Sequence, residues 1–344
     1  MCYIAPLKIR KYLKGFVHKA FAPFSRNSIV LHENYLYPLL EAARSHCYVE
    51  NTGNKADSLH RRVKQTCEED IQTAYLKLIM PLLKYQRITC PTLAIDFTDE
   101  DFYGMYGDPY LHPWTGEEGV NATYKYAVLS LVGKHKIPLL AVPVHLGMAK
   151  DEMMQLFLRV AHTIFRQLYC ILLDAGFYGG EVIQALQHEQ YVIRAPQNAK
   201  VQEYIEATSA HGWKRWTHTI RWCADKTTKK VQTTIVIVRH VRWKDTMIDC
   251  SYATNMLLHG MEYVHLYSKR WQIETNFRVE DQVHVKSKSV RIIIRYFYFM
   301  ISLLLHALWC FFFRTTMAFD TFKIRLANQL LFESLGVTYV DALV

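Results

Sequence analysis

The sequence predicts an α/β protein in which helices flank a mixed β-sheet, with a helical region before the sheet and a β-rich insertion within it. Three observations support this fold class. Hydrophobic residues make up 51% of the 344 residues, enough for a sizeable core. Apolar residues recur at helical spacing near the start of the chain. From residue 92, short apolar runs of strand type alternate with amphipathic helical segments.

The first region, residues 1–88, is predicted to be helical because apolar residues recur three and four apart in residues 35–43 and 74–83. The first thirty residues carry six Lys or Arg, and no acidic residue precedes Glu33. This basic start is either a solvated surface or part of a small DNA-binding region, and the sequence favours neither alternative.

The second region, residues 89–195, is predicted to form the first part of the sheet. Its expected elements are a strand at 92–98, a hairpin of strands at 124–132 and 139–146, a helix at 150–168, a strand at 169–174, a helix at 181–188 and a strand at 191–194. A crossover helix before the strand at 169–174 favours parallel pairing with the first strand. Asp96 and Asp174 end these two apolar runs, so we expect their carboxylates at the same edge of the sheet.

The third region, residues 196–255, is predicted to be a β-rich insertion. It is rich in Thr, Val and basic residues, and tryptophans are interleaved with the basic residues. Such tryptophans either stack on nucleic-acid bases or pack a small sheet, and packing is favoured for any single one. Trp216 and Trp222 are our candidate DNA contacts in this region.

The last region, residues 256–344, contains a predicted helix over residues 267–278. Tyr267, Arg270 and Glu274 are spaced three and four apart, so they lie on one face of such a helix. The row is either a surface ion pair, which is common and weak, or part of a site that holds a metal and a phosphate.

Asp96, Asp174 and Glu274 together could hold a divalent cation, because Mg²⁺ prefers oxygen ligands and Mn²⁺ accepts the same donors. Two such ions can activate a nucleophile and stabilise a leaving oxygen. Further acids follow Asp96 in residues 99–108. We assign them to a solvated loop and select Asp96 because the sheet would fix it.

The formal net charge of +10 and the pI of about 9.1 indicate a polyanionic partner, with nucleic acid favoured over an anionic membrane surface. The eight cysteines contain no Cys-x-x-Cys pair. We expect reduced, mostly buried thiols in a cytosolic protein, and no zinc site. Residues 296–313 contain no charged residue and are long enough to span a membrane, but a helix buried in a large core has the same composition, and we favour the core helix.

Tyr267, Arg270 and Glu274 match the motif Tyr-x2-Arg-x3-Glu-x6-Lys, which surrounds the third acid in one branch of the DDE transposases of prokaryotic insertion sequences. Residues 95–104 and 173–178 resemble the first-acid and second-acid motifs of archaeal members. Residues 252–255, 286–289 and the apolar helix ending near residue 309 resemble the rest of that domain. Over residues 90–315, the chain therefore resembles an archaeal-type DDE transposase.

The resemblance implies a ribonuclease-H-like catalytic core, formed by residues 89–195 and 256–344 around the insertion. It implies Mg²⁺- or Mn²⁺-dependent cleavage at transposon ends and attack of the freed 3′-hydroxyl on target DNA. Asp96, Asp174 and Glu274 would be the catalytic metal ligands, and Tyr267 and Arg270 would hold terminal phosphates.

One residue departs from the family pattern, because Asp281 occupies the position of the family's last Lys. Lys286 or Lys288 could supply the missing contact with the DNA backbone. The alternative function is a catalytically inactive, transposase-derived DNA-binding protein. The expected partner is double-stranded DNA at transposon ends and target sites, bound by a homodimer in a cytoplasmic, nucleoid-associated complex without a membrane.

Overall fold

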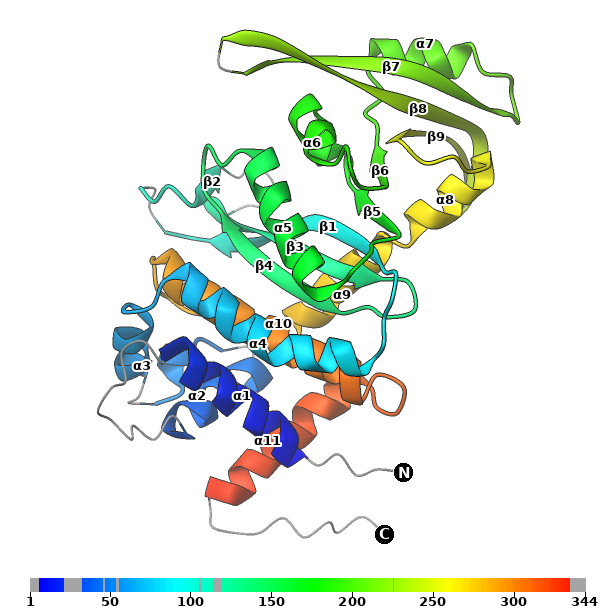
Figure 1. The fold of residues 1–344 in the computed structure, drawn as a ribbon. Coiled ribbons are helices and arrows are strands. Elements are labelled where there is room, and N and C mark those ends of the chain that lie inside the picture. Colours follow the sequence, from blue (N-terminus) through cyan, green and yellow to red (C-terminus); the bar gives the residue numbers. More distant parts are fainter. Residues whose placement is uncertain are drawn as a thin grey trace.

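The computed structural model describes residues 6–21, 33–45, 47–53, 56–104, 107–113, 119–224 and 226–334. These residues form a mixed sheet with helices on both faces (Figure 1). The N-terminal helices lie at one end of the molecule, and the strands of the insertion lie at the other (Figure 1). This arrangement confirms the predicted fold class.

One sheet contains all nine strands of the described residues. The strands are β1 (Thr92–Phe102), β2 (Leu111–Pro113), β3 (Ala122–Val132), β4 (Pro138–Val144), β5 (Cys170–Leu173), β6 (Tyr191–Arg194), β7 (Trp213–Ala224), β8 (Thr227–Trp243) and β9 (Thr246–Thr254). Their spatial order is β2-β3-β1-β5-β6-β9-β8-β7, and β4 also pairs with β3. Strand β5 is parallel to β1 and to β6, whereas β3, β4, β7, β8 and β9 pair with their neighbours in antiparallel fashion.

The helices surround this sheet. They are α1 (Pro6–Phe21), α2 (Glu33–Ser45), α3 (Ala56–Val63), α4 (Glu68–Tyr85), α5 (Lys150–Ile164), α6 (Gly180–Ala185), α7 (Ala199–Glu206), α8 (Gly260–Ser268), α9 (Trp271–Asp281), α10 (Ile292–Phe312) and α11 (Phe319–Ser334), with short 3₁₀ turns η2 (Val49–Asn51) and η3 (Ala175–Phe177). Helix α7 was not expected within the β-rich insertion. Its N-terminus is capped by Asn198, whose side chain accepts a hydrogen bond from the Val201 N–H.

Side chains along β1 and β5 alternate between two hydrophobic clusters, because successive residues of a strand point to opposite faces of a sheet. Leu93 and Leu173 belong to the larger cluster, which includes residues of α5 and α6. Ala94 and Leu172 belong to the second cluster, which includes Ile273 of α9 and residues of α8. The sheet is therefore covered by α5 and α6 on one face and by α8 and α9 on the other.

Helix α10 is the core helix of the protein. Among the described residues it alone is long and apolar enough to cross a membrane, and 83% of its most apolar stretch is buried inside the protein. The Phe297 ring stacks on Phe16 and Phe21 of α1, and the Tyr296 hydroxyl donates a hydrogen bond to the Ala141 carbonyl of β4. Packing on both sides accounts for its uniformly apolar composition.

Strand β1 is longer than predicted. The acids at 99–101 were assigned to a loop, but β1 pairs with β3 continuously from Thr92↔Val132 to Phe102↔Ala122. Because β3 supplies a partner for every residue of β1, the acidic stretch is held extended, and the loop assignment of Asp99, Glu100 and Asp101 is wrong.

Two other expectations concern the N-terminal region and the cysteines. Helix α1 is packed against α4 and α10, and its DNA-binding role stays a prediction. Residues 1–5 and 22–32 of the basic start lie outside the described residues.

The cysteines in the described part of the chain are free thiols, but Cys67, Cys90 and Cys223 are exposed. The expectation of mostly buried thiols is therefore wrong.

Candidate active site

Two of the predicted acids follow directly from the register of the parallel strands. Ile95 of β1 and Leu173 of β5 form the last pair between these two strands. Asp96 and Asp174 come next in the chain, so both lie just beyond the parallel pairing, although β1 itself continues beside β3 to Phe102. The predicted parallel pairing is confirmed. By the alternation of the strands, both residues point to the face covered by α8 and α9.

The third acid comes from the first turn of α9. The predicted single helix over residues 267–278 is wrong, because α8 ends at Ser268 and α9 begins at Trp271. Backbone hydrogen bonds still bridge the break, since the Arg270 N–H donates to the Tyr267 carbonyl at 2.9 Å and the Ile273 N–H donates to the Arg270 carbonyl at 2.8 Å. Arg270 and Glu274 therefore keep a helical spacing and face the same way.

The structure brings all three acids together around the guanidinium of Arg270. Arg270 Nη1 forms an ion pair with Asp96, and Arg270 Nη2 lies 2.8 Å from Glu274 Oε1 and 3.8 Å from Asp174 Oδ1. The Tyr267 hydroxyl donates a hydrogen bond of 3.4 Å to Asp174 Oδ1. Residues more than 170 positions apart in the chain thus share one charged cluster.

The cluster is buried on one side and open on the other. The side chains of Arg270 and Asp96 are 7% and 14% exposed, whereas those of Asp174 and Glu274 are 45% and 46% exposed. Burial raises the pKa of Asp96 to about 6, against the opposing effects of Arg270 and the hydrogen bond from the Phe97 N–H. Solvent therefore reaches the cluster from the side of Asp174 and Glu274.

The donor set of this cluster fits a hard divalent cation. All three acids offer carboxylate oxygens, which are the ligands that Mg²⁺ and Mn²⁺ prefer, and they already surround one positive charge. In the part of the chain that the structure describes, however, no three His, Cys, Asp or Glu side chains are gathered closely enough to hold a cation as they stand. Arg270 lies among the carboxylates instead.

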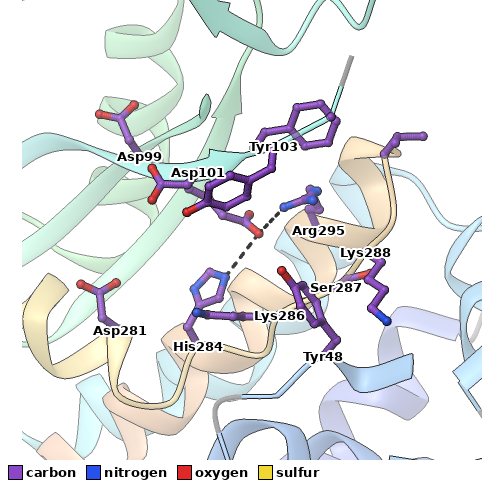
Figure 2. Close-up of a pocket in the computed structure, with 14 residues that line it drawn as sticks. Tyr48, Asp99, Asp101, Tyr103, Asp281, His284, Lys286, Ser287, Lys288 and Arg295 are labelled. Carbon is purple, nitrogen blue, oxygen red and sulfur yellow. Dashed lines mark hydrogen bonds and ion pairs between the residues drawn. The ribbon is translucent and has the colours of Figure 1, made fainter. Parts of the chain in front are cut away.

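The candidate lysines line a cavity of about 490 Å³ at the far end of β1 (Figure 2). Asp99, Asp101 and Asp281 also line it, on the opposite side from Lys288 in this view (Figure 2). The Lys288 Nζ donates a hydrogen bond to Asn51 at 3.2 Å. Lys286 therefore lies beside Asp281 in a cavity of mixed charge rather than among the three acids.

The candidate tryptophans lie on β7 and make packing contacts. Trp216 stacks on Tyr204 of α7, with ring centroids 5.0 Å apart. Trp222 covers Gly180 at the start of α6, where an added Cβ would lie 2.1 Å from the indole ring. Both side chains are half-buried, and the structure does not bring them to the three acids. Their role in DNA binding stays a prediction.

A buried network around Glu100, four residues along β1 from Asp96, was not expected from the sequence. Glu100 Oε1 pairs with Arg295 of α10 at 2.5 Å and with His284 at 3.5 Å; Arg295 and His284 are labelled in Figure 2. The Tyr126 hydroxyl donates a hydrogen bond to Glu100 Oε2 at 3.0 Å. No local signal marked Glu100, because residues 99–101 are all acidic and become a strand only through their pairing with β3.

Comparisons with known proteins agree with this architecture. A solved structure of the piggyBac transposase synaptic complex with hairpin DNA shares the fold with a TM-score of 0.54 and 11% sequence identity, covering 96% of this chain and 73% of that one. No curated protein matches the chain. The family described as the transposase DDE domain matches residues 122–309, which include Asp174 and Glu274 but begin after Asp96. The chain belongs to the transposase DDE domain family.

Proposed function

We propose that this transposase cuts DNA at transposon ends with the help of a divalent metal and joins the freed 3′-hydroxyl to target DNA. The observation that carries the proposal is the meeting of Asp96, Asp174 and Glu274 around one positive charge. These residues come from two strand ends and one helix, and they belong to a chain of the transposase DDE domain family.

The three acids would hold Mg²⁺ or Mn²⁺, and the bound metal would supply Lewis-acid activation of a phosphodiester and of the attacking oxygen. Asp174 and Glu274, the more exposed pair, would meet the DNA strand. Tyr267 and Arg270 would hold a terminal phosphate beside them, since a guanidinium binds phosphate through two parallel hydrogen bonds. In this proposal the set would correspond to the Tyr-Arg-Glu-Lys branch, from which the chain departs at Asp281.

The partner in this proposal is double-stranded DNA. The net charge of +10 favours a polyanion, and the similar piggyBac structure is a synaptic complex with DNA. Trp216, Trp222, Lys286 and Lys288 would contribute contacts away from the chemistry. A homodimer would bring two transposon ends together in the cytoplasm.

The test is a cleavage assay with Mg²⁺ on DNA that carries the terminal inverted repeats of the element. We expect Asp96→Asn, Asp174→Asn and Glu274→Gln each to lower the cleavage rate by at least about a hundredfold, because each removes a metal ligand. Binding to the ends, measured by gel shift, should change little. Asp101→Asn is the matched control, since it removes the same charge from an exposed position on the same strand.

If any one of the three variants cuts at the wild-type rate, the role assigned to that residue is wrong. The alternative function, an inactive DNA-binding protein, has one observation in its favour, namely Asp281 at the position of the family's last Lys. Wild-type protein that binds the ends but cuts neither with Mg²⁺ nor with Mn²⁺ would support that alternative. Asp281→Lys would then be expected to strengthen binding.

A further inference from the structure

Arg270 occupies the centre of the three carboxylates, where the proposed function requires a metal. Its side chain is only 7% exposed, and both of its terminal nitrogens face the acids. Its Nε is buried and has no hydrogen-bond partner among the described residues. The guanidinium is therefore held here by the acids rather than presented to solvent, where a DNA phosphate would meet it.

A guanidinium and a divalent cation compete for the same carboxylate oxygens. When all three acids are ionised, their charge of −3 and the +1 of Arg270 leave the cluster at −2, and a second cation placed beside Arg270 would be repelled by it. Loss of Arg270 alone would leave like charges crowded in a half-buried site. The Arg270 guanidinium and a divalent metal can therefore each neutralise the three acids, but not both at once.

Building on the proposed function, we infer that Arg270 is an internal counter-cation that closes the metal site until DNA arrives. A phosphate of the incoming strand draws the guanidinium off the acids, and the freed carboxylates then hold the divalent metal. DNA and metal bind cooperatively as a result, and by linkage each raises the affinity of the other by the same factor.

The surroundings of Arg270 favour such an exchange. The residue lies between the end of α8 at Ser268 and the start of α9 at Trp271, and not within one continuous helix. The ring of Tyr267 lies 5.6 Å from the guanidinium carbon and offers a second favourable surface for the cation. Asp174 and Glu274 are the exposed members of the cluster, so the guanidinium can be reached from solvent on their side.

The experiment titrates Mn²⁺ into the full-length protein by calorimetry, with and without a short duplex of the terminal DNA. In the absence of DNA, Arg270→Gln should bind Mn²⁺ at least about tenfold more tightly than the wild type, because the competing cation is gone. The duplex should raise the Mn²⁺ affinity of the wild type by a similar factor and that of Arg270→Gln much less. Asp174→Asn with the same duplex corrects for Mn²⁺ bound by the DNA itself.

Thermal unfolding gives a second readout. Arg270→Gln should be less stable than the wild type in a chelator and should gain more stability from Mn²⁺ than the wild type does, since the metal replaces the lost charge. If Arg270→Gln does not fold, Arg270→Lys is measured instead, because Lys keeps the positive charge but has one ammonium group in place of the two terminal nitrogens of the guanidinium. A rise of about threefold or more in the Mn²⁺ affinity of the Lys variant supports the inference, and no rise overturns it.

The outcomes separate this inference from the proposed function. If Arg270→Gln binds Mn²⁺ no more tightly than the wild type, and the binding still depends on Asp174, the three acids hold metal and the counter-cation role is wrong. If neither protein binds Mn²⁺ in a manner that depends on Asp174, with or without DNA, the proposed function itself fails.

Discussion

Replacement of Glu100 by Gln tests how much the buried network around this residue, at the far end of β1 from the three acids, contributes to the stability of the protein. The Glu100 side chain is 12% exposed. It pairs with Arg295 and His284 and accepts a hydrogen bond from the Tyr126 hydroxyl. Burial alone would raise its pKa, but the hydrogen bond and charge of His284, the charge of Arg295 and the Tyr126 hydroxyl together lower the pKa from 4.5 to about 2. Because one pKa unit is about 1.4 kcal/mol, this difference corresponds to about 3 kcal/mol of stability at neutral pH.

The sign of the pH dependence follows from the lowered pKa. The contribution of Glu100 is fully present above the pKa of the unfolded chain, near 4.5, and is lost as the pH falls towards about 2. Urea unfolding should therefore show Glu100→Gln about 3 kcal/mol less stable than the wild type at pH 7, and only about 1 kcal/mol less stable at pH 3.

Asp101→Asn is the control, because it removes the same charge from the neighbouring exposed position of β1. It should change the free energy of unfolding by no more than about 0.5 kcal/mol. If Glu100→Gln lowers the free energy of unfolding by less than about 1 kcal/mol at pH 7, or by the same amount at pH 7 and at pH 3, Glu100 does not stabilise the fold through its lowered pKa.

Two further predictions concern residues away from the acids. Burial lowers the pKa of His306 to about 3, so the folded protein keeps this side chain neutral where the unfolded chain, with a pKa near 6.5, takes up a proton. The stability of the folded state is therefore undiminished above pH 6.5 and falls as the pH drops below it. Between pH 7.5 and pH 5, urea unfolding should show the wild type losing about 2 kcal/mol more of its unfolding free energy than His306→Phe. Equal losses would contradict the neutral buried state of His306. Gly180→Ala should cost about 1–3 kcal/mol, because the added Cβ would meet the Trp222 ring at 2.1 Å, and a second change, Trp222→Leu, should recover part of that cost in thermal unfolding. A Gly180→Ala protein as stable as the wild type would show that this packing is not tight.

Local pattern was enough to predict the elements that place two of the three acids. The apolar runs that end at Asp96 and Asp174, with a helix between them, predict parallel strands, and the structure pairs Ile95 with Leu173 directly before these residues. The hairpin of β3 and β4 was also predictable, since β4 is a continuous apolar run and β3 is largely apolar, interrupted by Thr123, Lys125 and Ser130. Such patterns depend on residues close together in the sequence.

Other features depend on residues distant in the sequence and were not predictable. Residues 99–101 are all acidic, and they become a strand only because β3 pairs with every residue of β1. Glu100 is buried because Arg295 reaches it from α10, almost two hundred residues later. The break between α8 and α9 contains no Pro or Gly that would have marked it. Spacing predicted the pair of Arg270 with Glu274, but not that of Arg270 with Asp96.

In the proposed function Asp96, Asp174 and Glu274 share a divalent metal during DNA cleavage. Anomalous diffraction from crystals of the protein with Mn²⁺ and terminal DNA would locate that metal. We expect a Mn²⁺ peak within about 2–3 Å of carboxylate oxygens from all three residues, with the Arg270 guanidinium turned towards a phosphate. A peak bound by other residues, or a complex with DNA in which Arg270 still lies among the three carboxylates and no metal is present, would contradict it.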